Sequence, residues 1–136
     1  MILLDTNVLV ALVDERDRLH RRAKRDLRKL SPPFGVTSVV LSETFFLLEE
    51  TYLRARLRLL LERLPIQAVE PEAPWWTEVF DWMAQYAEHS PDLCDGMLAV
   101  LSGRAAASLW SYDAEVRTLW RRPDGKAIAV VPAASR

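Results

Sequence analysis

The feature that most constrains the fold is an apolar run at the start of the chain that ends abruptly in an acid. Residues 2–4 are apolar, Asp5, Thr6 and Asn7 are polar, and a second apolar run begins at Val8. A short apolar run closed by a polar break is typical of a buried strand, and Asp, Thr and Asn cap helices or form turns. We therefore expect a strand, a sharp turn and a helix. Asp5 then lies at the carboxyl end of a strand, where ligands bind in open parallel sheets, or it only caps the helix.

The rest of the chain alternates apolar segments of strand and helix character. The predicted strands span residues 2–4, 34–37, 66–69, 108–112 and 127–131, and the further predicted helices span residues 14–30, 39–50, 51–64, 75–87 and 93–107. Such alternation predicts an α/β fold with a mainly parallel central sheet flanked by helices on both faces. The 136 residues are expected to form one domain, 1–136. The helix over 39–50 is apolar nearly all round, which predicts a buried helix.

Charge and cysteine content bound the classes of function. No apolar run reaches the length of a membrane span, and the single cysteine, Cys94, cannot form an internal disulfide, which fits a cytoplasmic protein. The net charge of −1 does not indicate nucleic-acid binding. However, most of the 18 basic residues are arginines in clusters, and a local cluster can bind phosphates. The candidates are Arg21, Arg22, Arg25, Arg54 and Arg58, with a merely solvated helix face as the alternative.

Further acids occur where they can join Asp5. Glu43 lies within the helix predicted to be buried, where an ionised carboxylate needs a metal ion or a distant arginine as its partner. Asp92 and Asp95 are three residues apart and so share one face of a helix, although they could simply be first-turn acids favoured by the helix dipole. Asp113 follows a predicted strand as Asp5 does, which places both at one edge of the sheet.

A group of carboxylates without basic neighbours in sequence favours a hard cation. Oxygen ligands suit Mg²⁺ or Mn²⁺, so one of these is the expected cofactor. Zinc is poorly supported, because His20 and His89 are far apart in sequence and Cys94 is expected to point away from the face of Asp92 and Asp95. We assign these three residues structural roles. A glycine-rich phosphate loop and a Gly-x-Ser-x-Gly elbow do not occur in the sequence.

Taken in order, these motifs resemble the PIN-domain nucleases, and among them the VapC-type toxins of toxin–antitoxin pairs. The resemblance rests on Asp5-Thr6-Asn7 after a strand, Glu43 in an apolar helix, Asp95 at the start of a small-residue helix, and Ser111-Tyr112-Asp113 after a strand. It implies a single PIN-like domain and Mg²⁺- or Mn²⁺-dependent endonucleolytic cleavage of RNA. Asp5, Glu43, Asp95 and Asp113 fall on the family's acidic positions, Thr6, Asn7 and Ser111 fall on its polar supporting positions, and Asp92 is expected to be an auxiliary metal ligand.

The departures from the family pattern are mild. Gly96 stands where the family often has alanine, and Ser111-Tyr112 stands where it often has threonine and an apolar or aromatic residue. Asp95 is expected to be the primary ligand rather than Asp92, because its spacing to Asp113 fits the pattern better.

The expected partners are an RNA substrate, a cognate antitoxin and a second copy of the chain. The resemblance implies an antitoxin whose tail crosses the acidic site. The aromatic group Trp75, Trp76, Phe80 and Trp82 exceeds what one amphipathic stripe usually buries, which favours a homodimer over ordinary core packing. Two rival functions are a non-catalytic PIN-like module that binds RNA or protein, and a small phosphohydrolase built on Asp5. The second is weakened because Asn7, not a second Asp, lies two residues after Asp5.

Overall fold

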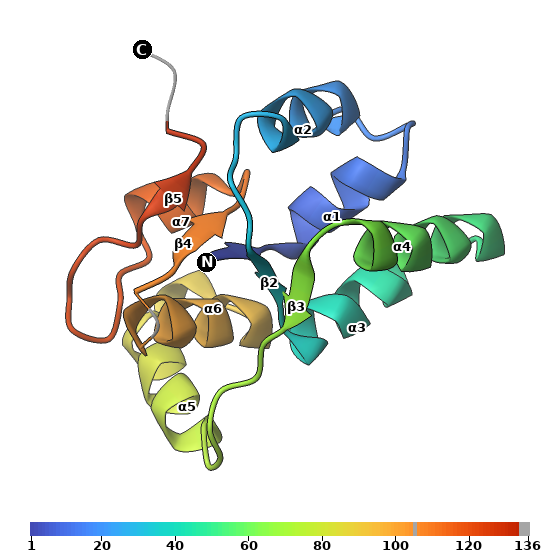
Figure 1. Ribbon diagram of the computed structural model, residues 1–136. Coiled ribbons are helices and arrows are strands. Elements are labelled where there is room, and N and C mark those ends of the chain that lie inside the picture. Colours follow the sequence, from blue (N-terminus) through green and yellow to red (C-terminus); the bar gives the residue numbers. More distant parts are fainter. Residues whose placement is uncertain (105, 134–136) are drawn as a thin grey trace.

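Five parallel strands form the central sheet of the computed structural model, which describes residues 1–104 and 106–133 (Figure 1). The strands are β1 (Ile2–Leu4), β2 (Phe34–Val36), β3 (Ile66–Ala68), β4 (Ser108–Trp110) and β5 (Val130–Val131), in the order β3-β2-β1-β4-β5. Every pairing is parallel, as the sequence predicts. The chain adds β2 and β3 on one side of β1 and then crosses to β4 on the other side. The carboxyl ends of β1 and β4 therefore flank the point where the strand order reverses.

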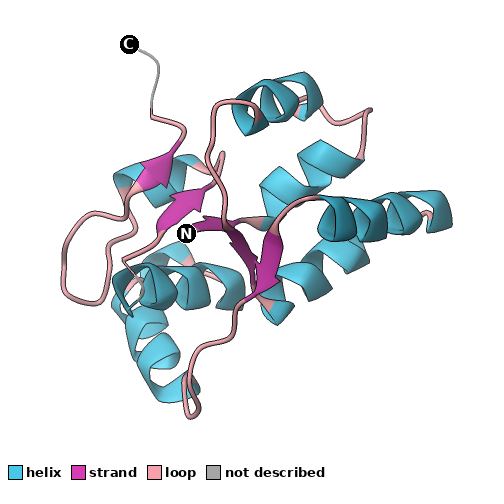
Figure 2. Ribbon diagram, viewed as in Figure 1, coloured by secondary structure: helices cyan, strands magenta, loops and turns pink. Residues whose placement is uncertain are grey.

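Helices cover both faces of this sheet (Figure 2). They are α1 (Thr6–Val13), α2 (His20–Leu27), α3 (Ser38–Leu47), α4 (Thr51–Arg63), α5 (Trp76–Gln85), α6 (Leu93–Arg104) and α7 (Ala114–Thr118), with a short 3₁₀ turn at Ala87–His89. No helix of the described residues is long and apolar enough to cross a membrane.

Helix α6, in which eight of the twelve residues are buried, packs between the sheet and α5. Its small residues permit this close packing. A Cβ atom at Gly96 would lie 2.8 Å from Cγ1 of Val79 and 3.0 Å from Cγ of Met83, so the glycine allows α5 to approach α6. Gly96, noted above as a departure from the resemblance, therefore has a local packing role.

Several predicted boundaries are wrong. The helix predicted over residues 14–30 begins only at His20, because the Asp17 carboxylate accepts a hydrogen bond from the Leu19 backbone N–H (2.9 Å) in a turn before it. The last strand covers only Val130–Val131, and α7 was not expected.

The prediction that the helix over residues 39–50 is buried is also wrong. In α3 only Val40 and Thr44 are fully buried, whereas Phe46 is 75% exposed and Leu47 is 54% exposed. A helix with apolar residues on every side can be buried in the core, or it can have one side in the core and another side at an interface. The spacing of its apolar residues does not distinguish these two cases.

Candidate active site

Six carboxylates gather in one pocket of about 380 Å³ at the carboxyl edge of the sheet. One is Asp17, from the turn before α2, which sequence reasoning did not select. The other five are the acids singled out in the sequence: Asp5, Glu43, Asp92, Asp95 and Asp113. They come from the ends of β1 and β4, from α3 and from the start of α6. Thr6 and Asn7 also line it. The topology of the sheet thus brings together acids that are up to 108 residues apart in the chain.

Asp5 both caps a helix and faces the pocket. One carboxylate oxygen accepts a hydrogen bond from the Thr6 backbone N–H at 2.8 Å, which caps α1. The other oxygen accepts a hydrogen bond from the Ser111 hydroxyl at 2.7 Å. Asp5 is therefore both a helix cap and a side chain at the ligand-binding end of a strand, so the two interpretations of the sequence are compatible. The side chain is only 7% exposed, which makes its charge costly.

The Ser111 hydroxyl joins the loops that follow β1 and β4. It donates to Asp5 Oδ2, and its oxygen accepts hydrogen bonds from Asn7 Nδ2 (3.3 Å) and from the Asp113 backbone N–H (3.1 Å). Asn7 completes the link, because its Oδ1 accepts a hydrogen bond from the Tyr112 backbone N–H at 3.2 Å. Asn7 and Ser111 therefore hold Asp5 and Asp113 on adjacent loops.

The other acids at helix starts also have structural contacts. Asp113 Oδ1 accepts from the Glu115 backbone N–H (2.9 Å) and caps α7. Asp92 and Asp95 cap the start of α6 reciprocally, each carboxylate accepting from the backbone N–H of the other at 2.9–3.0 Å. Since each cap occupies one oxygen, the second oxygen of each acid is left for another ligand.

Glu43 has no ion pair with an arginine or lysine in the described part of the chain. The distant salt bridge considered for it in the sequence is therefore not made there. Its nearest polar partner is the Cys94 thiol, whose Sγ lies 3.6 Å from Glu43 Oε2. Together with Asp92, these two residues offer ligand atoms within 4.8 Å of one another.

The prediction that Cys94 points away from the face of Asp92 and Asp95 is wrong, since its Sγ lies within 4.8 Å of an Asp92 carboxylate oxygen. The residue lines the pocket, because α3 packs against α6 and places Glu43 beside it. Burial, and then the Glu43 charge, raises the pKa of the Cys94 thiol, so it stays protonated and donates to Glu43. His20 and His89 do not line the pocket; His20 Nδ1 lies 2.7 Å from the Ala11 carbonyl oxygen, and His89 packs on Trp120.

The electrostatics of the pocket suit a bound cation. Burial, and to a lesser extent the charges of Asp113 and Asp92, raises the pKa of Asp5 to about 6. Burial and the neighbouring Asp92 carboxylate raise the pKa of Asp95 to about 7. In addition, the buried Thr6 hydroxyl has no hydrogen-bond partner among the described residues. Acids that resist ionisation and an unpaired hydroxyl beside them fit the oxygen ligand set of Mg²⁺ or Mn²⁺.

The arginines expected to bind phosphate lie outside the pocket. Arg22 pairs with Asp26 at 3.8 Å, Arg54 stacks over the Phe45 ring at 3.9 Å, and Arg58 pairs with Glu62 at 2.8 Å. Arg21 and Arg25 are exposed on α2. Sequence reasoning missed Arg18, which lines the acidic pocket from the turn between α1 and α2. Nothing separates Arg18 from its neighbours in the arginine-rich segment, and only the turn directs it to the acids.

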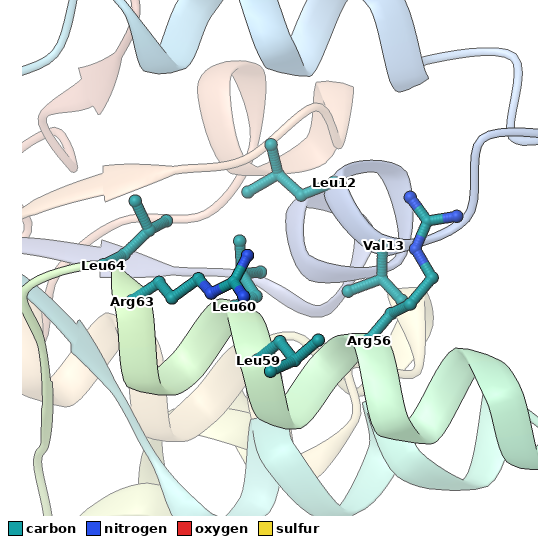
Figure 3. A pocket seen from close by; sticks show the side chains of 7 residues that line it. All are labelled: Leu12, Val13, Arg56, Leu59, Leu60, Arg63 and Leu64. Atoms are coloured by element: carbon teal, nitrogen blue, oxygen red, sulfur yellow. The ribbon is translucent and has the colours of Figure 1, made fainter.

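A second groove, between α1 and α4, has a different character (Figure 3). Leu12 and Val13 of α1 face Leu59, Leu60 and Leu64 across a volume of about 340 Å³, with Arg56 and Arg63 beside them. No carboxylate lines this groove, so it does not share the chemistry of the acidic pocket.

Comparison with known proteins gives a family and a set of structural neighbours. The model of the PIN domain family matches residues 2–120. VapC20 of Mycobacterium tuberculosis, a toxin that cleaves the sarcin–ricin loop, is 20% identical, with a TM-score of 0.73 over 85% of this chain and 92% of that one. No curated protein matches the chain significantly.

Two further neighbours align with nearly the whole chain. VapBC2 from Rickettsia felis, bound to a DNA fragment from its promoter, is 13% identical with a TM-score of 0.63, covering 96% of this chain and 97% of that one. FitAcB from Neisseria gonorrhoeae is 18% identical with a TM-score of 0.61, covering 96% of each chain. At these identities the likeness demonstrates a shared fold.

The raised pKa of Asp5 makes a prediction about stability. A carboxyl whose pKa is higher in the folded state than its usual 3.8 stabilises the fold only while it is protonated, so stability falls as pH rises from about 4 through about 6. In a chelator at pH 8, Asp5→Asn should stabilise the protein by roughly 3 kcal/mol, since the pKa rises from 3.8 to about 6 and each pKa unit is worth about 1.4 kcal/mol. Urea unfolding measures this difference.

The pH dependence of the unfolding free energy provides a control for this prediction. The advantage of Asp5→Asn should vanish near pH 4, where the native carboxyl is also neutral. Asp81→Asn, on the exposed face of α5, should give no comparable gain at either pH. A variant less stable than the parent at pH 8 would mean that Asp5 does not carry a destabilising charge.

Proposed function

The chain belongs to the PIN-domain family, and we propose that it is a metal-dependent endoribonuclease that acts as the toxin of a toxin–antitoxin pair. The observation that carries the proposal is the pocket of six carboxylates at the reversal of strand order, in which two acids have raised pKa values. The activity of the structural neighbour VapC20, cleavage of the sarcin–ricin loop, supports this assignment. We place its action in the cytoplasm, where RNA is available and Cys94 stays reduced.

The proposed cofactor is Mg²⁺ or Mn²⁺. Asp5, Asp95 and Asp113 would hold the ion, with Asp92 as an auxiliary ligand. When bound, such an ion neutralises charge on a phosphate and lowers the pKa of a bound water. Ser111 fixes the Asp5 carboxylate through its 2.7 Å hydrogen bond. Glu43, which has no ion pair in the described chain, is positioned to accept the proton of the attacking water.

The proposed substrate is single-stranded or looped RNA, because its unstacked bases are accessible to a protein pocket, whereas those of a duplex are stacked and paired. Arg18 at the pocket is the nearest candidate for a phosphate contact. Four exposed arginines of α2 and α4, and the half-buried Arg54 of α4, remain predicted to add weaker phosphate contacts. The four are Arg21, Arg22, Arg25 and Arg58. Binding through such residues should weaken as salt concentration rises.

Substitution of the acids tests the catalytic assignment. Asp5→Asn and Asp95→Asn should each abolish Mn²⁺-dependent cleavage of RNA while circular dichroism shows an intact fold. Asp92→Asn should weaken metal affinity about 10- to 100-fold, as expected when an outer ligand is lost. Cleavage is followed on labelled RNA by gel electrophoresis, with metal affinity taken from the Mn²⁺ dependence.

Asp81→Asn, an exposed acid of α5 outside the pocket, is the matched control and should cleave like the parent. Full activity in Asp95→Asn, together with none in Asp92→Asn, would reverse the roles of these two acids. RNA binding without any cleavage product, and without a response to divalent ions, would instead favour a non-catalytic binding module.

We propose an antitoxin as the protein partner. The acidic pocket would accept a basic side chain from it, since an arginine neutralises the same carboxylates as a divalent cation. The apolar groove between α1 and α4, flanked by Arg56 and Arg63, offers surface for an apolar segment with acidic flanks.

Competition at the pocket can be measured directly. Inhibition of cleavage by the antitoxin should weaken as Mg²⁺ concentration rises, because both species bind the same carboxylates. Potassium chloride at matched ionic strength controls for general screening. Inhibition that responds equally to Mg²⁺ and to the matched salt would place the antitoxin's basic group outside the pocket.

We also propose that the chain forms a homodimer through the exposed aromatic side chains of α5. Trp76 is 50% exposed and Phe80 is 57% exposed. Trp82 does not contribute, since it is buried in the core with its Nε1 donating to the Arg121 carbonyl oxygen at 2.7 Å. Exposed aromatic groups of this kind mark interfaces, where tryptophan supplies much of the binding free energy.

Light scattering tests the dimer. The isolated chain should have the mass of two copies at micromolar concentration, and the double substitution Trp76→Ala with Phe80→Ala should shift it to one copy. A parent chain that remains monomeric throughout this range would contradict the proposal.

A further inference from the structure

A second hollow adjoins the acidic pocket on the α3 side. It has a volume of about 720 Å³, larger than the acidic pocket. Glu43, Asp92 and Cys94 line both spaces and so form a shared wall. Arg18 lines only the acidic pocket and Phe46 lines only the hollow. The two spaces therefore adjoin at Glu43, Asp92 and Cys94.

Phe46 is the feature of this hollow that the fold does not explain. At 75% it is the most exposed of the large hydrophobic side chains in the described chain, and it packs against neither hydrophobic core. It lies three residues after Glu43, so both side chains project from the same face of α3. Its neighbour Phe45 is covered by the Arg54 guanidinium, whereas no ring or guanidinium of the described residues stacks on Phe46.

The remaining walls indicate the chemistry of the occupant. Ser38 and Ser42 supply hydroxyl groups, and Val39 and Leu93 supply apolar surface. No lysine or arginine lines the hollow, so it is not built for a phosphate. A flat ring open to solvent, hydroxyl donors and acceptors, and no cationic group together suit a nucleobase, which stacks on aromatic side chains and hydrogen-bonds through its edges.

We propose that this hollow is a base subsite, in which Phe46 stacks on the base of a nucleotide next to the scissile phosphate. The inference rests on the proposed ribonuclease function and adds to it a residue that positions the substrate. Continuity with the catalytic carboxylates favours RNA as the occupant over a protein surface, because a segment bound at the acids must leave the pocket along one of its walls.

The test uses a short single-stranded RNA that the parent chain cleaves, and the same RNA with the base removed from either nucleotide beside the cleavage site. Removal of one of these two bases should raise the parent's KM about tenfold, the loss expected for one stacked base. Phe46→Ala should raise KM for the intact RNA by a similar factor. The KM of the Phe46→Ala variant should not change when that base is removed. Phe46→Trp should have the KM values of the parent for both RNAs.

Tyr52→Ala is the matched control, since Tyr52 is half exposed but lines neither the acidic pocket nor the hollow. It should respond to base removal as the parent does. The proposal is overturned if Phe46→Ala cleaves the intact RNA with the parent's KM. It is also overturned if the increase in KM caused by Phe46→Ala and the increase caused by base removal are fully additive. It is also overturned if light scattering shows that Phe46→Ala alone dissociates a dimer, because Phe46 is then a subunit contact.

These outcomes are distinct from failure of the proposed function. A parent chain that cleaves no RNA in Mn²⁺ would refute the ribonuclease assignment and the subsite with it. Cleavage that depends on Asp95 but not on Phe46 would refute the subsite alone.

Discussion

The hydrogen bond between the Ser111 hydroxyl and the buried Asp5 carboxylate is the interaction on which the proposed site depends. At 2.7 Å it joins the loop after β4 to the loop after β1, which are adjacent only because the strand order reverses there. The same hydroxyl accepts the Asp113 backbone N–H, so one side chain sets the position of two acids. The sheet brings the two loops together, and this contact holds the Asp5 and Asp113 carboxylates in position.

Without a bound cation, the buried acids of the site lower the stability of the fold. Burial raises the pKa values of Asp5 and Asp95, and the helix caps made by Asp92, Asp95 and Asp113 offset only part of the repulsion among the acids. Acids whose arrangement lowers the stability of the fold are expected at functional sites, where a bound ligand stabilises that arrangement. A divalent cation would remove the conflict, so the stability of the free chain and its proposed affinity for metal would be linked.

The parts of the site that the sequence predicts are those with a local cause. Asp5 and Asp113 each follow a short apolar strand, and parallel strands bring their carboxyl ends to one edge. Glu43 is recognisable as an acid without a cationic neighbour in an apolar helix. The directions of Cys94 and Arg18 depend on how α3 packs against α6 and on a turn before α2, and no local pattern encodes either. The exposure of Phe46 is likewise unpredictable, because core and interface faces of a helix have the same composition.

The central claim is that Asp5 and Asp95 are ligands of one divalent ion, and calorimetric titration with Mn²⁺ tests it most directly. At a pH between about 6 and 7 both acids are partly protonated in the free protein, and metal ligands must be deprotonated. Binding should therefore release protons, seen as a heat that changes with the ionisation enthalpy of the buffer and diminishes in Asp95→Asn. Binding heat that is independent of the buffer, or that is unchanged in Asp95→Asn, would contradict the account.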